Sequence, residues 1–344
     1  MNKQTERKSN LRLIIETLRM FGPVPQARLK EQCNLQASTV SYLINDLKKE
    51  NLVVDLGKEE TQGRVGKPGN VVSLNNAAAV FLGMYVEDDF LYAYLVGIDG
   101  RTVSADCVQY TPSAVEQVIF STIEEKMRRY NNICGIGIAI KAIVYSDGRI
   151  KSGARHGEEG GRWDLVNLPI SLKTAFPGVP IIVENDANSA AELYRYEQKC
   201  DNFVLYILND IPFGIGCGLM INGQVYRGAA GAAGEFFVKD LQVQQIHEAV
   251  DQRGDALERT LEMIQAHMMQ TAYLLDPERF VLTGSLFRDV SDEDAARAQA
   301  YLTKIPRPVV IDHGPAQSLN PARGVALRAI NTYIELYLEE MTKR

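Results

Sequence analysis

The chain opens with three segments whose apolar residues recur at helical spacing. The first is expected to end before Gly22 and Pro23, which terminate helices, and its apolar positions are Leu11, Ile14, Ile15 and Leu18. Further helices are expected over residues 26–33 and 37–50. The pattern then changes to two strands, 52–55 and 71–74, joined by a glycine-rich basic loop. Three helices followed by a hairpin predict a winged helix-turn-helix.

The third helix leaves small polar side chains on its outer face, where they can approach the phosphates and base edges of DNA: Ser38, Thr39, Ser41, Tyr42 and Asn45. The loop of the hairpin carries Arg64 and Lys67, which are suited to reach backbone phosphate or the minor groove. The alternative is a three-helix module that binds another protein. Residues 1–75 have a net charge of +4 and the remainder −10, which favours DNA binding by this segment.

From residue 79 onward, strands occur in clusters that are followed by helices. The first cluster is expected at 80–86, 90–96 and 102–110, followed by helix 113–130, strand 133–140 and helix 165–176. The second is expected at 203–209, 214–221 and 223–226, followed by helix 257–275, strand 280–283 and helix 321–337. This doubled order predicts an α/β fold of two lobes with a cleft between them.

Two motifs in this second part could bind a ligand. Residues 181–191 form a buried strand that runs into a helix, which places Asn185 and Asp186 at the carboxyl end of the strand, where ligand sites of α/β folds form. The glycines of residues 214–234 let the backbone come close to a ligand or to other backbone. Glu235, which follows them, can accept two sugar hydroxyls. Two alternatives remain open: the glycines form only tight turns, and Asp186 only caps the helix.

With these motifs in this order, the chain resembles the ROK family of bacterial sugar kinases and sugar-responsive repressors of the xylose and N-acetylglucosamine type. The resemblance rests on the winged segment, on Glu184-Asn185-Asp186-Ala187-Asn188, on residues 228–235 and on Asn320-Pro321-Ala322-Arg323-Gly324. It implies a winged helix-turn-helix followed by a two-lobed actin-like (ribonuclease H-like) domain of the sugar-kinase type. It also implies a homodimer or tetramer and a sugar-type effector that contacts Asn185, Asp186 and Glu235. In kinase members the residue that matches Asp186 is the catalytic base.

The implied organisation is a DNA-binding domain over 1–76 and an effector-binding and dimerisation domain over 77–344. The lobes of the second domain are expected at about 77–185 together with the C-terminal helix, and at 186–318.

The chain departs from the family's kinases at both phosphate loops and at the zinc site. Residues 83–89 lack the glycine pair and threonine of the first phosphate loop, and Pro212-Phe213-Gly214 replaces the second. Val238 stands where the family has its zinc-binding histidine, and no closely spaced cysteines follow it. We therefore expect no kinase activity, no metal and no cofactor.

Arg155 and His156 lie in a loop beside the expected sugar site. Because arginine binds phosphate and carboxylate through two parallel hydrogen bonds, the pair suggests a sugar phosphate or sugar acid as the ligand. The alternative is that both side chains only face solvent.

The sequence thus favours a transcriptional regulator, most simply a repressor of carbohydrate-related genes that binds a palindromic operator in double-stranded DNA. One alternative is a sugar kinase with an appended DNA-binding segment, and another is a regulator whose ROK-like scaffold no longer binds an effector. The polar N-terminus, five widely spaced cysteines and lack of a long apolar run lead us to expect a cytoplasmic protein that does not interact with membranes.

Overall fold

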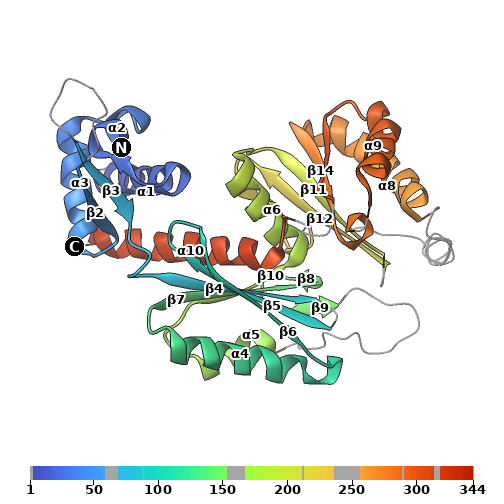
Figure 1. Cartoon of the computed structure of the whole chain (residues 1–344), viewed down its shortest axis with the longest axis horizontal. Helices are drawn as coiled ribbons and strands as arrows, with labels where there is room; N and C mark the ends of the chain where they lie inside the picture. Colours follow the sequence, from blue (N-terminus) through green and yellow to red (C-terminus); the bar gives the residue numbers. More distant parts are fainter. Residues whose placement is uncertain are drawn as a thin grey trace.

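The computed structural model describes residues 3–58, 69–87, 89–152, 167–210, 213–235, 256–288, 290–313 and 318–343. Within these residues the strands form a three-stranded sheet near the N-terminus, two five-stranded sheets and one two-stranded sheet (Figure 1). We call residues 1–76 the head and residues 77–344 the body. The expected α/β class is confirmed, and each of the two expected strand clusters forms a sheet of its own.

The head contains the three expected helices and the expected hairpin. Its elements are α1 (Lys3–Phe21), β1 (Val24–Pro25), α2 (Gln26–Gln32), α3 (Ala37–Lys49), β2 (Val53–Lys58) and β3 (Asn70–Leu74). The strand order is β1-β3-β2, with antiparallel pairs throughout. Strand β1 was not predicted, because two residues are too short to show an alternating pattern. The predicted apolar face of α1 is buried together with that of α3.

The first large sheet has the strand order β10-β7-β4-β5-β6. Its strands are β4 (Val80–Glu87), β5 (Phe90–Gly97), β6 (Thr102–Gln109), β7 (Ile133–Ile140) and β10 (Ile181–Asn185). The 3₁₀ turn η1 (Pro112–Ala114), helix α4 (Val115–Arg129) and helix α5 (Leu168–Ala175) follow the strands as expected, and a small hairpin of β8 (Ala142–Val144) and β9 (Ile150–Ser152) was not predicted. We call this sheet and its helices α4 and α5 lobe I.

The second large sheet repeats this topology with the strand order β13-β12-β11-β14-β15. Its strands are β11 (Phe203–Asp210), β12 (Phe213–Ile221), β13 (Gln224–Val225), β14 (Arg279–Thr283) and β15 (Val309–Ile311). Its helices are α8 (Ala256–Leu275) and α9 (Asp292–Tyr301), with the 3₁₀ turns η2 (Ser285–Phe287) and η3 (Leu302–Lys304). In both sheets, three antiparallel strands precede two parallel ones. We call this sheet and its helices lobe II; its α9 and β15 were not predicted.

Alternation along the strands assigns each face of a sheet to a different layer. In β4, Leu82, Met84 and Val86 pack with α4 and α5, whereas Phe81 and Tyr85 face the opposite side. That opposite side carries α10 (Pro321–Lys343), and the corresponding face of lobe II carries α6 (Asp186–Gln198). The helices α6 and α10 therefore lie between the two sheets (Figure 1).

Glycines allow these central helices to touch the strands and each other at backbone distance. A Cβ atom at Gly83 of β4 would lie 1.9 Å from the carbonyl oxygen of Ala322, and one at Gly137 of β7 would lie 2.5 Å from that of Val325. A Cβ at Gly324 of α10 would lie 1.7 Å from the carbonyl oxygen of Ser189 in α6. Only a residue without a side chain fits at these three contacts.

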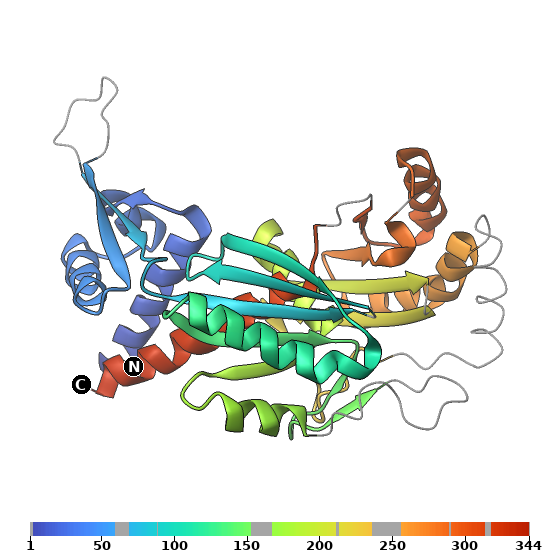
Figure 2. The same cartoon turned by 60° about the horizontal axis from the view of Figure 1, so that its bottom comes forward.

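The head is attached to the far end of α10 through α1 (Figure 2). Arg7 donates to the carbonyl oxygen of Met341 at 3.0 Å, and Arg19 donates to Oδ1 of Asn331 at 2.6 Å. Arg12 forms an ion pair with Glu335 between them. Helix α10 thus contacts the head, lobe I and α6. In the part of the chain that the structure describes, no helix is both long and apolar enough to cross a membrane.

The contact at Gly324 provides a test of this packing. Replacing a helical glycine by alanine normally stabilises a helix by up to about 1 kcal/mol. Here the new methyl group would collide with the backbone of α6, so we expect Gly324→Ala to lower the free energy of unfolding by about 2 kcal/mol. Urea denaturation measures the change. Gly69→Ala is the control, because its Cβ would meet its nearest neighbour at an ordinary 3.7 Å. Equal effects of the two substitutions would contradict the close packing.

Candidate functional site

The outer face of α3 presents the polar side chains that the sequence predicted there. Ser38, Ser41, Tyr42 and Asn45 are exposed, and Thr39 is half-buried. The side chain of Tyr42 is 56% exposed, which is high for an aromatic residue in a helix whose other face is buried. The loop residues Arg64 and Lys67 lie outside the described residues.

The opposite face of α3 is held by apolar packing and one partly buried ion pair. Val40, Leu43, Ile44 and Leu47 are at most 2% exposed. Asp46 accepts a hydrogen bond from Arg7 of α1 at 2.9 Å. Because α1 is itself fixed to α10, the exposed face of α3 has a set orientation relative to the body.

The second candidate site lies where β10 ends and α6 begins. Asn185 is the N-cap of α6, and its Oδ1 accepts hydrogen bonds from the amides of Ala187 and Asn188 at 2.9 and 3.2 Å. Its Nδ2 donates to the carbonyl oxygen of Ala142 at 3.2 Å. Both polar atoms of Asn185 therefore hold the local backbone in place. The capping that we considered for Asp186 is performed mainly by its neighbour.

Asp186 is buried, with 5% exposure, and its Oδ1 accepts a hydrogen bond from the amide of Ala187 at 2.9 Å. Burial raises the pKa of Asp186 to about 6, against the stabilising charge of Lys141 and the backbone hydrogen bond. The negative charge of Glu87 raises this pKa further. A carboxyl group with such a pKa exchanges its proton near neutral pH.

Three charged residues near Asp186 were not predicted as site residues. Glu87 at the end of β4 lies 3.7 Å from Lys141, which follows β7, and 3.5 Å from Arg288, which follows η2 of lobe II. Burial and then Glu87 raise the pKa of Tyr92 to about 12. The sequence showed Glu87 only as part of residues 83–89, which depart from the family's first phosphate loop. Nothing in it pointed to Arg288, which comes from the other lobe.

The glycine run brings Glu235 to the same region. Gly231 has a φ of +92°, and a Cβ there would lie 2.6 Å from the carbonyl oxygen of Val144. Ser146 of the β8–β9 turn donates its amide to the carbonyl oxygen of Ala230 at 2.9 Å. Glu235 follows this contact and is exposed, yet nearby protein atoms and the charge of Asp186 raise its pKa. The two predicted acids, Asp186 and Glu235, are thus brought within electrostatic reach of each other.

Glu184, one residue before Asn185, binds the two lobes together. It is 4% exposed; its Oε1 accepts from the amide of Asn185 at 2.9 Å and from Nδ2 of Asn188 at 3.0 Å. Its Oε2 lies 2.6 Å from Nη2 of Arg227, which follows β13, and 3.2 Å from Nε of Arg328 in α10. A carboxylate buried this deeply is tolerated because both oxygens have partners.

Two hairpins stand at the positions where the family's kinases have their phosphate-binding loops. The register of β4 and β5 is unbroken up to Glu87 and Phe90, so two residues join them. The register of β11 and β12 likewise reaches Asp210 and Phe213. Neither hairpin leaves residues for a wider loop. Arg155, His156 and Val238 lie outside the described residues.

A model of the ROK family matches residues 89–236, which include β10, the start of α6 and the glycine run. The chain carries a ROK family domain. The xylose repressor of Bacillus subtilis (strain 168) is 26% identical to it over 239 residues, which are 67% of this chain and 59% of the repressor. The xylose repressor of Staphylococcus xylosus is 26% identical over 217 residues, which are 62% of this chain and 55% of that repressor. The chain thus matches somewhat under three fifths of the length of these relatives.

Solved structures confirm the fold of the ROK domain and the head. The crystal structure of a ROK family transcriptional regulator, described as a homologue of the E. coli MLC protein, superposes with a TM-score of 0.68 at 16% identity, covering 99% of this chain and 100% of that one. A ROK hexokinase from Thermus thermophilus superposes with a TM-score of 0.58 at 18% identity, covering 75% and 99%. The predicted winged head on an actin-like, kinase-type body is confirmed.

The raised pKa of Asp186 predicts a specific pH dependence of stability. Because this pKa is higher in the folded protein than in the unfolded chain, its contribution is fully present below about pH 4 and is lost as the pH rises through about 6. Asp186→Asn removes the titrating carboxyl group and therefore removes this loss of stability at higher pH. We therefore expect the stability of the variant relative to the wild type to increase by about 2–3 kcal/mol between pH 4 and pH 8.

Urea denaturation at a series of pH values measures this difference. Glu116→Gln, at an exposed position of α4, is the control and should show no such trend. If the difference in stability between Asp186→Asn and the wild type stays constant across this pH range, the pKa of Asp186 is not raised in the folded protein.

Proposed function

We propose that the chain is a DNA-binding transcriptional regulator, acting as a repressor of carbohydrate-related genes, that responds to a sugar or sugar derivative bound by its ROK domain. The observation that carries the proposal is the exposed polar face of α3, held rigidly on a head that is joined through α1 to the ROK domain. Ser38, Thr39, Ser41, Tyr42 and Asn45 are the residues that we assign to DNA contact. Arg64 and Lys67 are assigned to the phosphates or the minor groove.

The relatives support the same assignment. Those cited above are named xylose repressors, and the structural neighbour that covers the whole chain is a ROK family transcriptional regulator. A neutral sugar is the simplest effector, contacted by Asp186, Glu235 and Asn185. If the effector is a sugar phosphate or sugar acid, we assign Arg155 and His156 to its acidic group.

We infer that the protein has no kinase activity. Phosphoryl transfer needs a loop that cradles the phosphates and their metal ion. Here β4 and β5 are joined by two residues, and the carboxylate of Glu87 at their junction faces Lys141 and Arg288. An anionic triphosphate would have to displace this carboxylate. The pKa of Asp186, at about 6, nevertheless suits a general base, so kinase activity is the alternative that the tests below include.

The proposed organisation is a DNA-binding domain over 1–76 and an effector-binding and dimerisation domain over 77–344. The separate sheets of the head and the two lobes support this division. A homodimer or tetramer would place two α3 helices about one helical turn apart on a palindromic operator. We expect such a regulator to act in the cytoplasm.

DNA binding is tested with sequences selected from a random double-stranded library on the full chain. Tyr42→Ala and Asn45→Ala should each weaken binding of the selected site at least tenfold, because each removes a side chain expected at a base edge or phosphate. Fluorescence anisotropy at fixed salt measures the affinity. Ser121→Ala, on an exposed position of α4, should leave it unchanged. If no sequence is selected, or if all variants bind with equal affinity, α3 does not contact DNA as proposed.

Effector binding is tested by thermal shift with neutral sugars, sugar phosphates and sugar acids, and with ATP–magnesium in parallel. A sugar at about 100 times its Kd should stabilise the wild type by about 2.7 kcal/mol. Asp186→Asn and Glu235→Gln should abolish the shift, whereas Glu116→Gln should retain it. Stabilisation by ATP together with phosphorylation of a sugar would support the kinase instead. No shift with any sugar would favour a scaffold without an effector.

A further inference from the structure

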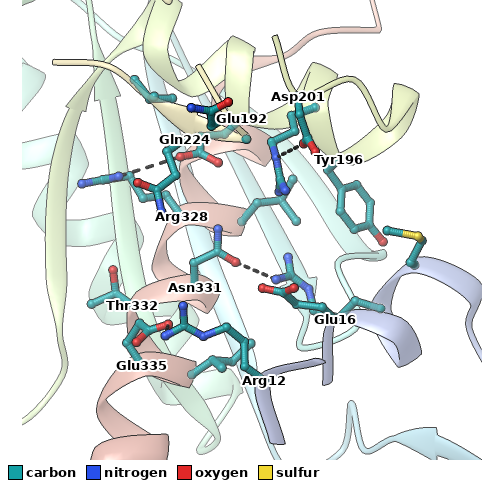
Figure 3. Close-up of a pocket in the computed structure, with 18 of the residues that line it drawn as sticks. Arg12, Glu16, Glu192, Tyr196, Asp201, Gln224, Arg328, Asn331, Thr332 and Glu335 are labelled. Carbon is teal, nitrogen blue, oxygen red and sulfur yellow. Dashed lines mark hydrogen bonds and ion pairs between the residues drawn. The ribbon is translucent and has the colours of Figure 1, made fainter. Parts of the chain in front are cut away.

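A cavity of about 610 Å³ lies where the head meets the body (Figure 3). Its walls come from α1, α6, α10 and the turn between β12 and β13. It is separate from the proposed sugar site, because Asn185, Asp186 and Glu235 are not part of its lining. Its volume is within the range that holds a small molecule.

The lining of this cavity, which we call the junction cavity, is rich in basic groups. Six basic side chains and four acidic ones face it: Arg12, Arg19, Arg195, Lys199, Arg227 and Arg328, and Glu16, Glu192, Asp201 and Glu335. Glu184, beneath the wall, pairs with both Arg227 and Arg328, and Glu192 lies 3.8 Å from Arg328. Arg12 pairs with Glu335, and Arg195 pairs with Asp201 at 2.9 Å.

Two cations of the junction cavity make no ion pair with any described residue, namely Arg19 and Lys199. Both lie over the ring of Tyr196: the guanidinium carbon of Arg19 is 5.6 Å and Nζ of Lys199 is 4.4 Å from its centroid. The ring is fixed in place, because its hydroxyl donates to the carbonyl oxygen of Asp99 at 2.7 Å. One aromatic ring therefore gathers two like charges between α1 and the end of α6.

The local geometry and electrostatics of both cations fit a site for a negative charge. Lys199 is the C-cap of α6, with a left-handed φ of +54°, and its Nζ donates to the carbonyl oxygen of Tyr196. Desolvation by nearby protein atoms, and then the charges of Arg19 and Arg195, lower the pKa of Lys199, although much of its side chain is exposed. Nε of Arg19 is buried and has no hydrogen-bond partner among the described residues. An anion bound between Arg19, Lys199 and Arg195 would relieve the repulsion among these three cations.

We propose that the junction cavity binds a small organic anion that carries a phosphate or carboxylate group. Arg19 and Lys199 bind the anionic group, and the polar walls of α10 and the β12–β13 turn accept the remainder of the molecule. Since Arg19 belongs to the head and Lys199 to the body, a bound anion holds the two together. The site is independent of the proposed sugar site and goes beyond the proposed function.

The experiment is isothermal titration calorimetry on the full chain at constant ionic strength. The probes are glycerol 3-phosphate for the phosphate class, citrate for the carboxylate class, and glycerol as an uncharged match. The expected result is binding of at least one anion, with glycerol at least tenfold weaker. Arg19→Gln and Lys199→Gln should each weaken the anion at least tenfold. Arg128→Gln, which removes an exposed arginine of α4 in lobe I, should bind as the wild type does.

Hydrogen exchange with and without the bound anion locates the site. Protection is expected in α1 and around Asn331 in α10, whereas the start of α6 should be unchanged. Lys199 is exposed, so its substitution tests the site even if Arg19→Gln impairs folding. The proposal is overturned if neither anion binds, if all three variants bind equally well, or if the protection falls at Asn185 and Asp186. None of these outcomes depends on whether the protein binds DNA or responds to a sugar.

Discussion

The fold depends on the backbone contacts of one helix, α10. Gly83 and Gly137 allow it to lie directly on the first sheet, and Gly324 allows it to touch α6. Because the backbones touch at these glycines and a packed interior has few voids, a shift of α10 has to be accompanied by movement of the strands or of α6. The same helix continues to the head, where Asn331, Glu335 and Met341 bind α1. A displacement of α10 at lobe I is therefore transmitted to the base of the head.

The sequence predicted those features whose signal is local. The apolar periodicities of α1 and α3, the strand clusters and the strand that runs into α6 each extend over a few turns or one strand, and the structure has them within a few residues of the expected bounds. The polar face of α3 follows from the same periodicity. The capping role of Asn185 is local too, but the sequence left it open because Asp186 beside it has the same chemistry.

What the sequence did not predict depends on contacts between distant segments. Glu87 and Arg288 are about 200 residues apart in the chain and meet only because the lobes face each other. The junction cavity takes its lining from α1, α6 and α10, and none of these helices shows in its own sequence that Arg19 and Lys199 share the ring of Tyr196. The elements α9 and β15 were missed for a different reason, since short polar helices and three-residue strands have little periodicity.

Glu184 connects these observations physically. It lies on β10 of lobe I, immediately before the residues assigned to the effector, and its two arginine partners come from lobe II and from α10. Since moving Arg227 away would break an ion pair with a buried carboxylate, this contact favours the arrangement of the lobes in which Glu184 keeps both arginines. An effector that binds one arrangement better than another would shift this equilibrium by its difference in affinity and no more. Arg227 and Arg328 also line the junction cavity, so the same ion pairs border both proposed ligand sites. A rotation of lobe II that moves Arg227 away from Glu184 changes the wall of the cavity against which α1 is held. The proposed regulator therefore has one set of partly buried charges through which either ligand can act on the orientation of α3.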